Sequence, residues 1–176
     1  MAIKRAKGNT GKSSAAKARL NPTHNDLPTD VRHAVVNLLA PYLASAVDLH
    51  WQAKQAHWNV KGPNFIGLHE LFDRVAEAVD GWADLLAERV VQLGGVAEGT
   101  VQVAAGRSAL PAYPLDILRW SDHVEALSSS LAAFGRLVRE GIDQAGELGD
   151  QDTADLCTEI SREVDKFVWF VEAHNP

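Results

Sequence analysis

The chain has 176 residues, of which 46% are apolar and 23% are charged, and its formal net charge is −6. This length can bury the core of one domain, and the composition is that of an ordinary globular protein. No apolar run approaches the roughly 18–20 residues of a membrane-spanning helix, so we predict no membrane association. The single cysteine, Cys157, excludes an internal disulfide and fits a reducing cytoplasmic compartment.

The charge is divided unevenly along the chain. Residues 1–20 carry six cations and no acid, whereas the remaining 156 residues carry 11 cations and 23 acids, a net charge of −12. We therefore predict a disordered basic tail over residues 1–28 and one folded domain over residues 29–176. The cations of the tail are Lys4, Arg5, Lys7, Lys12, Lys17 and Arg19.

Three kinds of function suit this tail. Six cations would bind the phosphates of DNA without sequence specificity and in a salt-dependent manner. The alternatives are a solubilising tail and an organellar transit peptide, which is also basic and poor in acids.

The first helix is predicted to begin with Thr29 as N-cap and to continue to residue 58. Just before and within its start, His24, Asp30 and His33 form a possible peripheral metal site, although no clear further ligand accompanies them. His50 shares a face with His57, and we interpret it as a packing or interface residue.

The second helix is predicted over residues 65–93, with Asn64 as its cap and Gly94-Gly95 as its stop. On a helical wheel, one side of this helix is apolar and predicted to be buried. The residues of that side are Leu68, Leu71, Phe72, Val75, Val79, Trp82, Leu86 and Leu93. The opposite side carries one histidine and three carboxylates that could be metal ligands, with Glu77 and Asp80 in the same sector; they are His69, Asp73, Asp84 and Glu88.

This polar side has few cations to balance its acids, since only Arg74 and Arg89 lie at its edges. Like charges one turn apart repel each other. A solvated polar stripe is one interpretation, but a bound cation accounts better for uncompensated acids. Carboxylates together with imidazole suit iron, manganese or zinc, and no thiolate is nearby.

The remaining elements complete an all-α bundle. A long connection over residues 96–114 leads to a third helix predicted over residues 115–145, with Leu118 among its inward residues. A fourth helix is predicted over residues 152–173, and four long amphipathic helices form a four-helix bundle. The acids at the start of the fourth helix complement its dipole. They are Asp150, Asp152 and Asp155.

Six segments resemble the Dps-like mini-ferritins, the DNA-binding proteins from starved cells. They are KQAHWNVKGPNF (54–65), LHELFD (68–73), AERVVQLGG (87–95), YPLDI (113–117), DTADL (152–156) and DKFVWFVE (165–172). The resemblance implies a ferritin-like four-helix bundle with a short extra helix between the second and third helices, expected around residues 97–104. It also implies assembly into a hollow homo-oligomer, a dodecamer.

The resemblance further implies a ferroxidase that oxidises Fe(II) with hydrogen peroxide or dioxygen and stores the Fe(III) mineral; zinc or manganese are possible substitutes. His57, His69 and Asp73 map onto iron ligands from one subunit, and Asp84 and Glu88 onto ligands from its neighbour. The alternatives for Trp58 are a core aromatic residue or an electron donor beside the metal.

Two more properties follow from the resemblance. The acids Asp150, Asp152 and Asp155 map near a threefold pore through which iron passes. Some family members bind DNA through Lys-rich N-termini, which implies DNA as a partner and a nucleoid-associated location. The rival hypotheses are a structural nucleoid shell with a vestigial or zinc-occupied site, and a true ferritin, which would carry the Glu-x-x-His pairs that this chain lacks.

Overall fold

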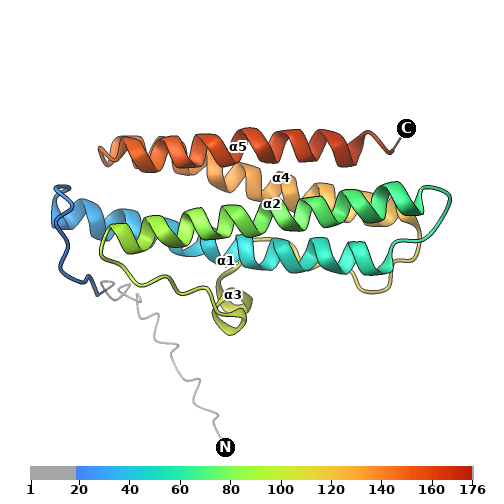
Figure 1. Cartoon of the computed structure of the whole chain (residues 1–176), viewed down its shortest axis with the longest axis horizontal. Coiled ribbons are helices and arrows are strands. Elements are labelled where there is room, and N and C mark those ends of the chain that lie inside the picture. Colours follow the sequence, from blue (N-terminus) through green and yellow to red (C-terminus); the bar gives the residue numbers. More distant parts are fainter. Residues whose placement is uncertain (1–18, 176) are drawn as a thin grey trace, which may run out of the picture.

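The computed structural model describes residues 19–175, and within them the chain forms five helices and no strand. Four long helices lie side by side, and the short α3 lies in the connection between α2 and α4 (Figure 1). The helices are α1 (Thr29–Asn59), α2 (Phe65–Gln92), α3 (Val101–Arg107), α4 (Trp120–Glu147) and α5 (Gln151–Glu172). The predicted all-α four-helix bundle with a short extra helix is confirmed. None of these described helices is both long and apolar enough to cross a membrane.

The bundle consists of two helical hairpins that pack on each other. The α1–α2 and α4–α5 pairs make the most extensive contacts, and α1 also packs on α4 while α2 packs on α5. All eight residues of the predicted apolar side of α2 are buried. Complete burial of such a side chain contributes about 1.5–3 kcal/mol each, so this side fixes the rotation of α2. The histidine and carboxylate side consequently faces away from the chain's own core.

The helix starts differ from the prediction in two places. Thr29, predicted as the N-cap, is the first residue of α1, and Pro28 occupies the cap position. Asn64 occupies the cap position of α2, but its side chain makes no capping hydrogen bond. Its backbone has φ −98° and ψ 17°, outside the extended conformation from which a side chain reaches the first turn.

Contacts with the bundle already begin at Leu20, earlier than the domain boundary predicted after residue 28. Leu20 and Leu27 pack against the core, and the Asn21 amide donates a hydrogen bond of 2.7 Å to the Gly94 carbonyl. Gly94 has φ +87°, and a Cβ there would lie 2.6 Å from the Asn21 oxygen. Glycine at this position therefore permits both the turn after α2 and the seating of the N-terminal segment.

The connection between α2 and α4 is less helical than predicted. α3 begins at Val101, four residues after the expected start, with the Thr100 side chain as its cap. α4 begins only at Trp120, and Leu118 is 72% exposed, so its assignment to the inward face of a helix was wrong. The buried Gln52 of α1 donates to the Pro111 carbonyl, which holds this connection in an extended conformation against α1.

Candidate metal centre

Two histidines meet where α1 passes into α2. His57 lies in the last turn of α1 and His69 near the start of α2, and their rings stack with centroids 3.7 Å apart. His57 Nδ1 lies 2.7 Å from the His69 carbonyl oxygen, and His69 Nδ1 lies 2.8 Å from the His57 carbonyl oxygen. A carbonyl only accepts, so each Nδ1 carries a hydrogen and each neutral ring keeps Nε2 as its free lone pair. This tautomer leaves Nε2 free, which is one of the two ring nitrogens through which a histidine binds a metal.

The carboxylate of Asp73 lies beside the histidine pair. Its Oδ1 is 4.0 Å from His57 Nδ1, and the Lys54 ammonium group donates a hydrogen bond to it at 2.5 Å. The hydrogen bond from Lys54 is the largest cause that lowers the pKa of Asp73 below its ordinary value, so this side chain is an anion over the physiological range. Lys54 was missed because it lies on α1, whereas the charge balance was counted on α2 alone. Its position three residues before His57 was the available signal.

Replacing Lys54 with methionine is expected to raise the pKa of Asp73 toward its ordinary value. The folded pKa is lowered, so the ion pair stabilises the fold above the unfolded value of 3.8, and this contribution is lost as the pH falls through the lowered pKa. The Asp73 carboxyl shift in an NMR titration of the metal-free protein measures this change. A titration midpoint that is the same in both proteins would show that Lys54 does not act on Asp73.

Asp84 and Glu88 lie on the same side of α2, one turn apart and exposed. Asp84 lines a hollow between α1, α2 and the following connection, and Glu88 lines an adjacent one. Fifteen residues of helix separate His69 from Asp84, which corresponds to about 22 Å. Within residues 19–175 no three His, Cys, Asp or Glu side chains are grouped to hold one metal ion, so neither the pair Asp84 and Glu88 nor the neighbours His57, His69 and Asp73 form a complete site within one chain. A single chain therefore presents two separate sets of ligands, three side chains at one end and two at the other.

Two tryptophans stand beside the histidine set. Trp58 is 58% exposed, which excludes the first of its two alternatives, a core aromatic residue of this chain. Its ring centroid is 6.3 Å from that of Trp51, which is also exposed and which sequence reasoning did not single out. The spacing of seven residues on α1 places both on one face, and this spacing was the available signal.

Comparison with known proteins shows the family of this chain. Residues 36–175 match the ferritin-like domain family. The DNA protection during starvation protein (Dps) of Agrobacterium fabrum is 45% identical over 156 residues, which cover 89% of this chain and 96% of that protein. The chain belongs to the Dps family of ferritin-like proteins. The Dps of Mycolicibacterium smegmatis is 36% identical over 140 residues, covering 80% of this chain and 76% of that protein.

Solved Dps structures share the fold. Dps from Microbacterium arborescens in its high iron form is 36% identical and has a TM-score of 0.78, covering 86% of this chain and 97% of that chain. Mycobacterium smegmatis Dps in a tetragonal form is 34% identical, has a TM-score of 0.83 and covers 88% of this chain and 94% of that chain. The predicted ferritin-like, Dps-type bundle is thereby confirmed.

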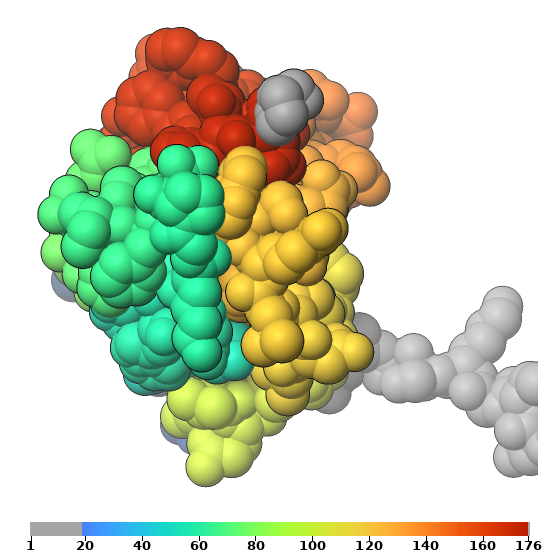
Figure 2. Space-filling view, turned by 90° about the vertical axis from the view of Figure 1, so that its right-hand side faces the viewer, coloured from blue at the N-terminus to red at the C-terminus, as the bar shows by residue number. Residues whose placement is uncertain are grey.

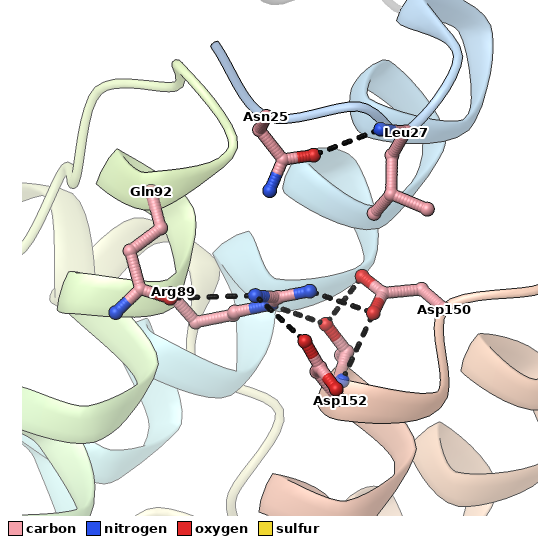
Figure 3. Close-up of polar contacts among 7 residues, drawn as sticks. Asn25, Leu27, Arg89, Gln92, Asp150 and Asp152 are labelled. Atoms are coloured by element: carbon pink, nitrogen blue, oxygen red, sulfur yellow. Dashed lines mark hydrogen bonds and ion pairs between the residues drawn. The ribbon is translucent and has the colours of Figure 1, made fainter. Parts of the chain in front are cut away.

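The three acids at the start of α5 differ in their surroundings in this Dps chain. Asp150 is only 2% exposed, and its carboxylate accepts a hydrogen bond of 2.6 Å from Arg89 Nη2 (Figure 3). Asp150 also caps α5 by accepting from the Thr153 amide. Because the Asp150 carboxylate is buried in the ion pair and in the helix cap, it has no exposed surface with which to line a pore. Of the three predicted pore residues, only Asp152 and Asp155 are exposed.

The other candidate residues lie apart from this centre. His24, Asp30 and His33 form no group of three ligands in the described part of the chain. The Nδ1 atom of His50 lies 3.1 Å from the carbonyl oxygen of Ala76. This contact links α1 to α2, as expected for a packing residue. Cys157 is buried, and burial raises the pKa of its thiol to about 11, which makes it unreactive at neutral pH.

Most of the predicted DNA-binding residues lie outside the described residues. These are Lys4, Arg5, Lys7, Lys12 and Lys17. Arg19 is described and is exposed at the beginning of the segment that packs near Gly94.

Proposed function

We propose that this Dps protein oxidises Fe(II) at sites shared by two subunits and stores the Fe(III) as mineral inside a dodecameric shell. The observation that supports this most strongly is the separation of two incomplete ligand sets on one exposed side of α2. His57, His69 and Asp73 form one set, and Asp84 and Glu88 form the other. Each set needs the complementary set of another copy to surround a metal ion.

The donor chemistry fits iron as the substrate. Neutral imidazole and carboxylate bind Fe(II), and carboxylates favour the harder Fe(III) that forms on oxidation. Zinc and manganese have compatible ligand preferences and are expected to compete for the same donors. A solved Dps structure from Microbacterium arborescens, 36% identical to this chain, is described as a high iron form, which supports iron as the substrate here.

The reaction that we assign balances with hydrogen peroxide as the oxidant. Two Fe(II) give one electron each, and one peroxide with two protons becomes two water molecules. The stacked histidines and Asp73 are proposed to bind Fe(II). Backbone carbonyls orient the two histidine rings, and Lys54 orients the Asp73 carboxylate. Dioxygen is the alternative oxidant. Trp58, which directly follows His57 in the sequence and is exposed, is proposed to supply an electron when only one Fe(II) is bound.

Iron is proposed to reach the interior through a pore lined by Asp152 and Asp155. Both side chains are exposed at the start of α5, where the neighbouring Asp150 is withdrawn into the ion pair with Arg89 (Figure 3). The acidic charge of residues 21–176 favours the uptake of cations over anions.

The direct test mixes the metal-free assembly with Fe(II) under anaerobic conditions, adds hydrogen peroxide and follows Fe(III) absorbance. The wild type is expected to oxidise iron far faster than the uncatalysed reaction, and a His57→Ala/Asp84→Ala double variant is expected to lose this rate. A Glu70→Gln variant, which changes an exposed carboxylate one residue from His69, serves as the matched control. A wild-type rate equal to the uncatalysed one would instead favour a structural shell that binds DNA and holds zinc.

DNA binding is proposed to reside in the N-terminal tail, which also accounts for a nucleoid-associated location. The relatives are named for the protection of DNA during starvation, and the acidic body of this chain repels phosphates. Six cations in each of many tails would bind with strong salt dependence and high avidity.

Deletion of residues 2–18 is expected to abolish DNA binding while iron oxidation is retained. The deletion removes five of the six tail cations and leaves the segment that packs near Gly94. Gel-shift assays at increasing salt measure the loss, and the iron assay on the same sample verifies an intact assembly. DNA binding that persists after the deletion would move the interface to the body of the protein.

A further inference from the structure

Trp51 and Trp58 form an exposed aromatic pair on α1, of which the proposed reaction uses only one member. Their ring centroids lie 6.3 Å apart, and 48% and 58% of their surfaces are open. Trp58 directly follows His57, a proposed iron ligand, near the end of the bundle shown in Figure 2, where α1 passes into α2. Trp51 lies two helical turns, about 10 Å, further from that end. The pair therefore leads from the proposed iron site to a second exposed point on α1.

We propose that Trp51 is the terminal electron donor when a single Fe(II) reacts with hydrogen peroxide, and that Trp58 passes the electron on. The proposal rests on the proposed function, in which Trp58 supplies the second electron. Fe(II) gives one electron, and Trp51 gives the other together with its indole N–H proton. The peroxide takes both electrons, that proton and one proton from the solvent, and its O–O bond breaks to give two water molecules. The products are Fe(III) and a neutral Trp51 radical, and no hydroxyl radical is released.

Positive charge near Trp58 favours the loss of an electron from Trp51 over its loss from Trp58. The ammonium nitrogen of Lys54 lies 6.0 Å from the centre of the Trp58 ring. Iron bound by His57 would add positive charge beside the same residue. A cation close to an indole ring is repelled by the positive charge that the ring acquires on oxidation. In the part of the chain that the structure describes, no cation lies over the Trp51 ring, so the electron deficiency is more stable there.

His50 provides a base beside Trp51. The two rings meet edge to face, with centroids 5.1 Å apart. The Nδ1 atom of His50 lies 3.1 Å from the Ala76 carbonyl oxygen, which only accepts, so Nδ1 carries the hydrogen and Nε2 keeps a lone pair. An indole that has lost an electron is far more acidic than the neutral ring, and a neutral imidazole can take its N–H proton. Loss of this proton holds the electron deficiency at Trp51. A small thiol can then restore the exposed radical by giving a hydrogen atom, and two of the resulting thiyl radicals join as a disulfide.

Iron-limited turnover tests the pair in the full-length assembly. Less than one Fe(II) per ligand set is mixed with excess hydrogen peroxide and no thiol; peptide mass spectrometry then locates oxidised tryptophan, and spin trapping measures hydroxyl radical. In the wild type, oxidation is expected to collect at Trp51 with little hydroxyl radical. Trp51→Phe keeps an aromatic ring but resists oxidation, so it is expected to release several-fold more hydroxyl radical. Trp51→Tyr, which can be oxidised, is expected to restore the low wild-type yield, whereas a packing role would not distinguish Phe from Tyr.

Trp169 of α5 is the control for exposure, because 65% of its surface is open, more than for either member of the pair. Hydroxyl radical made in solution by an iron chelate and peroxide gives the reference pattern of oxidation, which follows exposure in the assembly. Iron-limited turnover is expected to raise the ratio of Trp51 to Trp169 oxidation several-fold above this reference. Trp58→Phe is expected to return the ratio to the reference, because the electron then has no path from Trp51.

Three outcomes would overturn the proposal. One is a wild-type ratio of Trp51 to Trp169 oxidation equal to the reference, a comparison that does not depend on the folding of any variant. The others are equal hydroxyl radical yields from the wild type and Trp51→Phe, and excess Trp51 oxidation that persists in Trp58→Phe. Each of these leaves the ferroxidase proposal standing if Fe(III) still forms far faster than in the uncatalysed reaction. A wild-type rate equal to the uncatalysed one would refute both proposals together.

Discussion

Co-assembly of His57→Ala and Asp84→Ala subunits is expected to restore about a quarter of the wild-type iron oxidation that each variant lacks alone. Each single variant damages both sites of a symmetric dimer, because every site takes one ligand set from each copy. In a mixed dimer, one site receives both substitutions and the other receives neither. Random mixing gives mixed pairs in about half of the dimers, so about one site in four is intact.

The measurement requires equal amounts of the two variants, dissociated and reassembled together, followed by the anaerobic iron assay. The control is each variant reassembled by itself, which is expected to stay at the uncatalysed rate. A His57→Ala/His69→Ala mixture of single variants provides a second control, because both residues belong to one ligand set and mixing cannot regenerate a site. No activity in the first mixture would place all the ligands within one subunit, whereas activity in the second control would show that His57 and His69 belong to different sites.

Replacement of Asp150 with alanine is expected to destabilise the fold by about 3–5 kcal/mol, the largest effect on stability that we predict. The Arg89 side chain is 8% exposed, and its guanidinium donates to Asp150 at 2.6 Å and to the Thr153 hydroxyl at 2.9 Å (Figure 3). Removing the carboxylate leaves a buried cation unpaired and also removes the cap of α5. Urea unfolding at one fixed subunit concentration measures the change.

The matched control is Asp165→Ala, which breaks the exposed pair with Arg139 and is expected to lose less than about 1 kcal/mol. A combined Arg89→Met/Asp150→Ala variant is expected to recover part of the loss, since no buried charge then lacks a partner. If Asp150→Ala proves no more harmful than Asp165→Ala, the buried pair does not stabilise this end of the bundle. Arg89 directly follows Glu88 in α2. The iron oxidation rate of Asp150→Ala therefore also tests whether the Arg89–Asp150 pair positions the Glu88 carboxylate.

Much of the bundle was predictable because its information is local. The apolar residues of α2 recur at helical spacing, and this periodicity alone determined which side is buried and which carries the ligands. The same holds for the helix that follows Gly149, where Asp150 and Thr153 have the spacing of a cap. Leu118 was misassigned because periodicity continued past Pro114, while Gln52 of α1 holds that connection in an extended conformation.

The amino-acid sequence by itself determined the helical fold, the opposite charges of tail and body, and the candidate ligands on α2, since each depends on composition or on spacing within one element. Only the tertiary structure decided what those residues meet. In the folded chain, His57 and His69 each place Nδ1 beside the other's backbone carbonyl. Lys54 forms an ion pair with Asp73, and Asp150 is buried in an ion pair with Arg89. These contacts join helices whose relative rotation and height are fixed by core packing, and no spacing within a single helix encodes them.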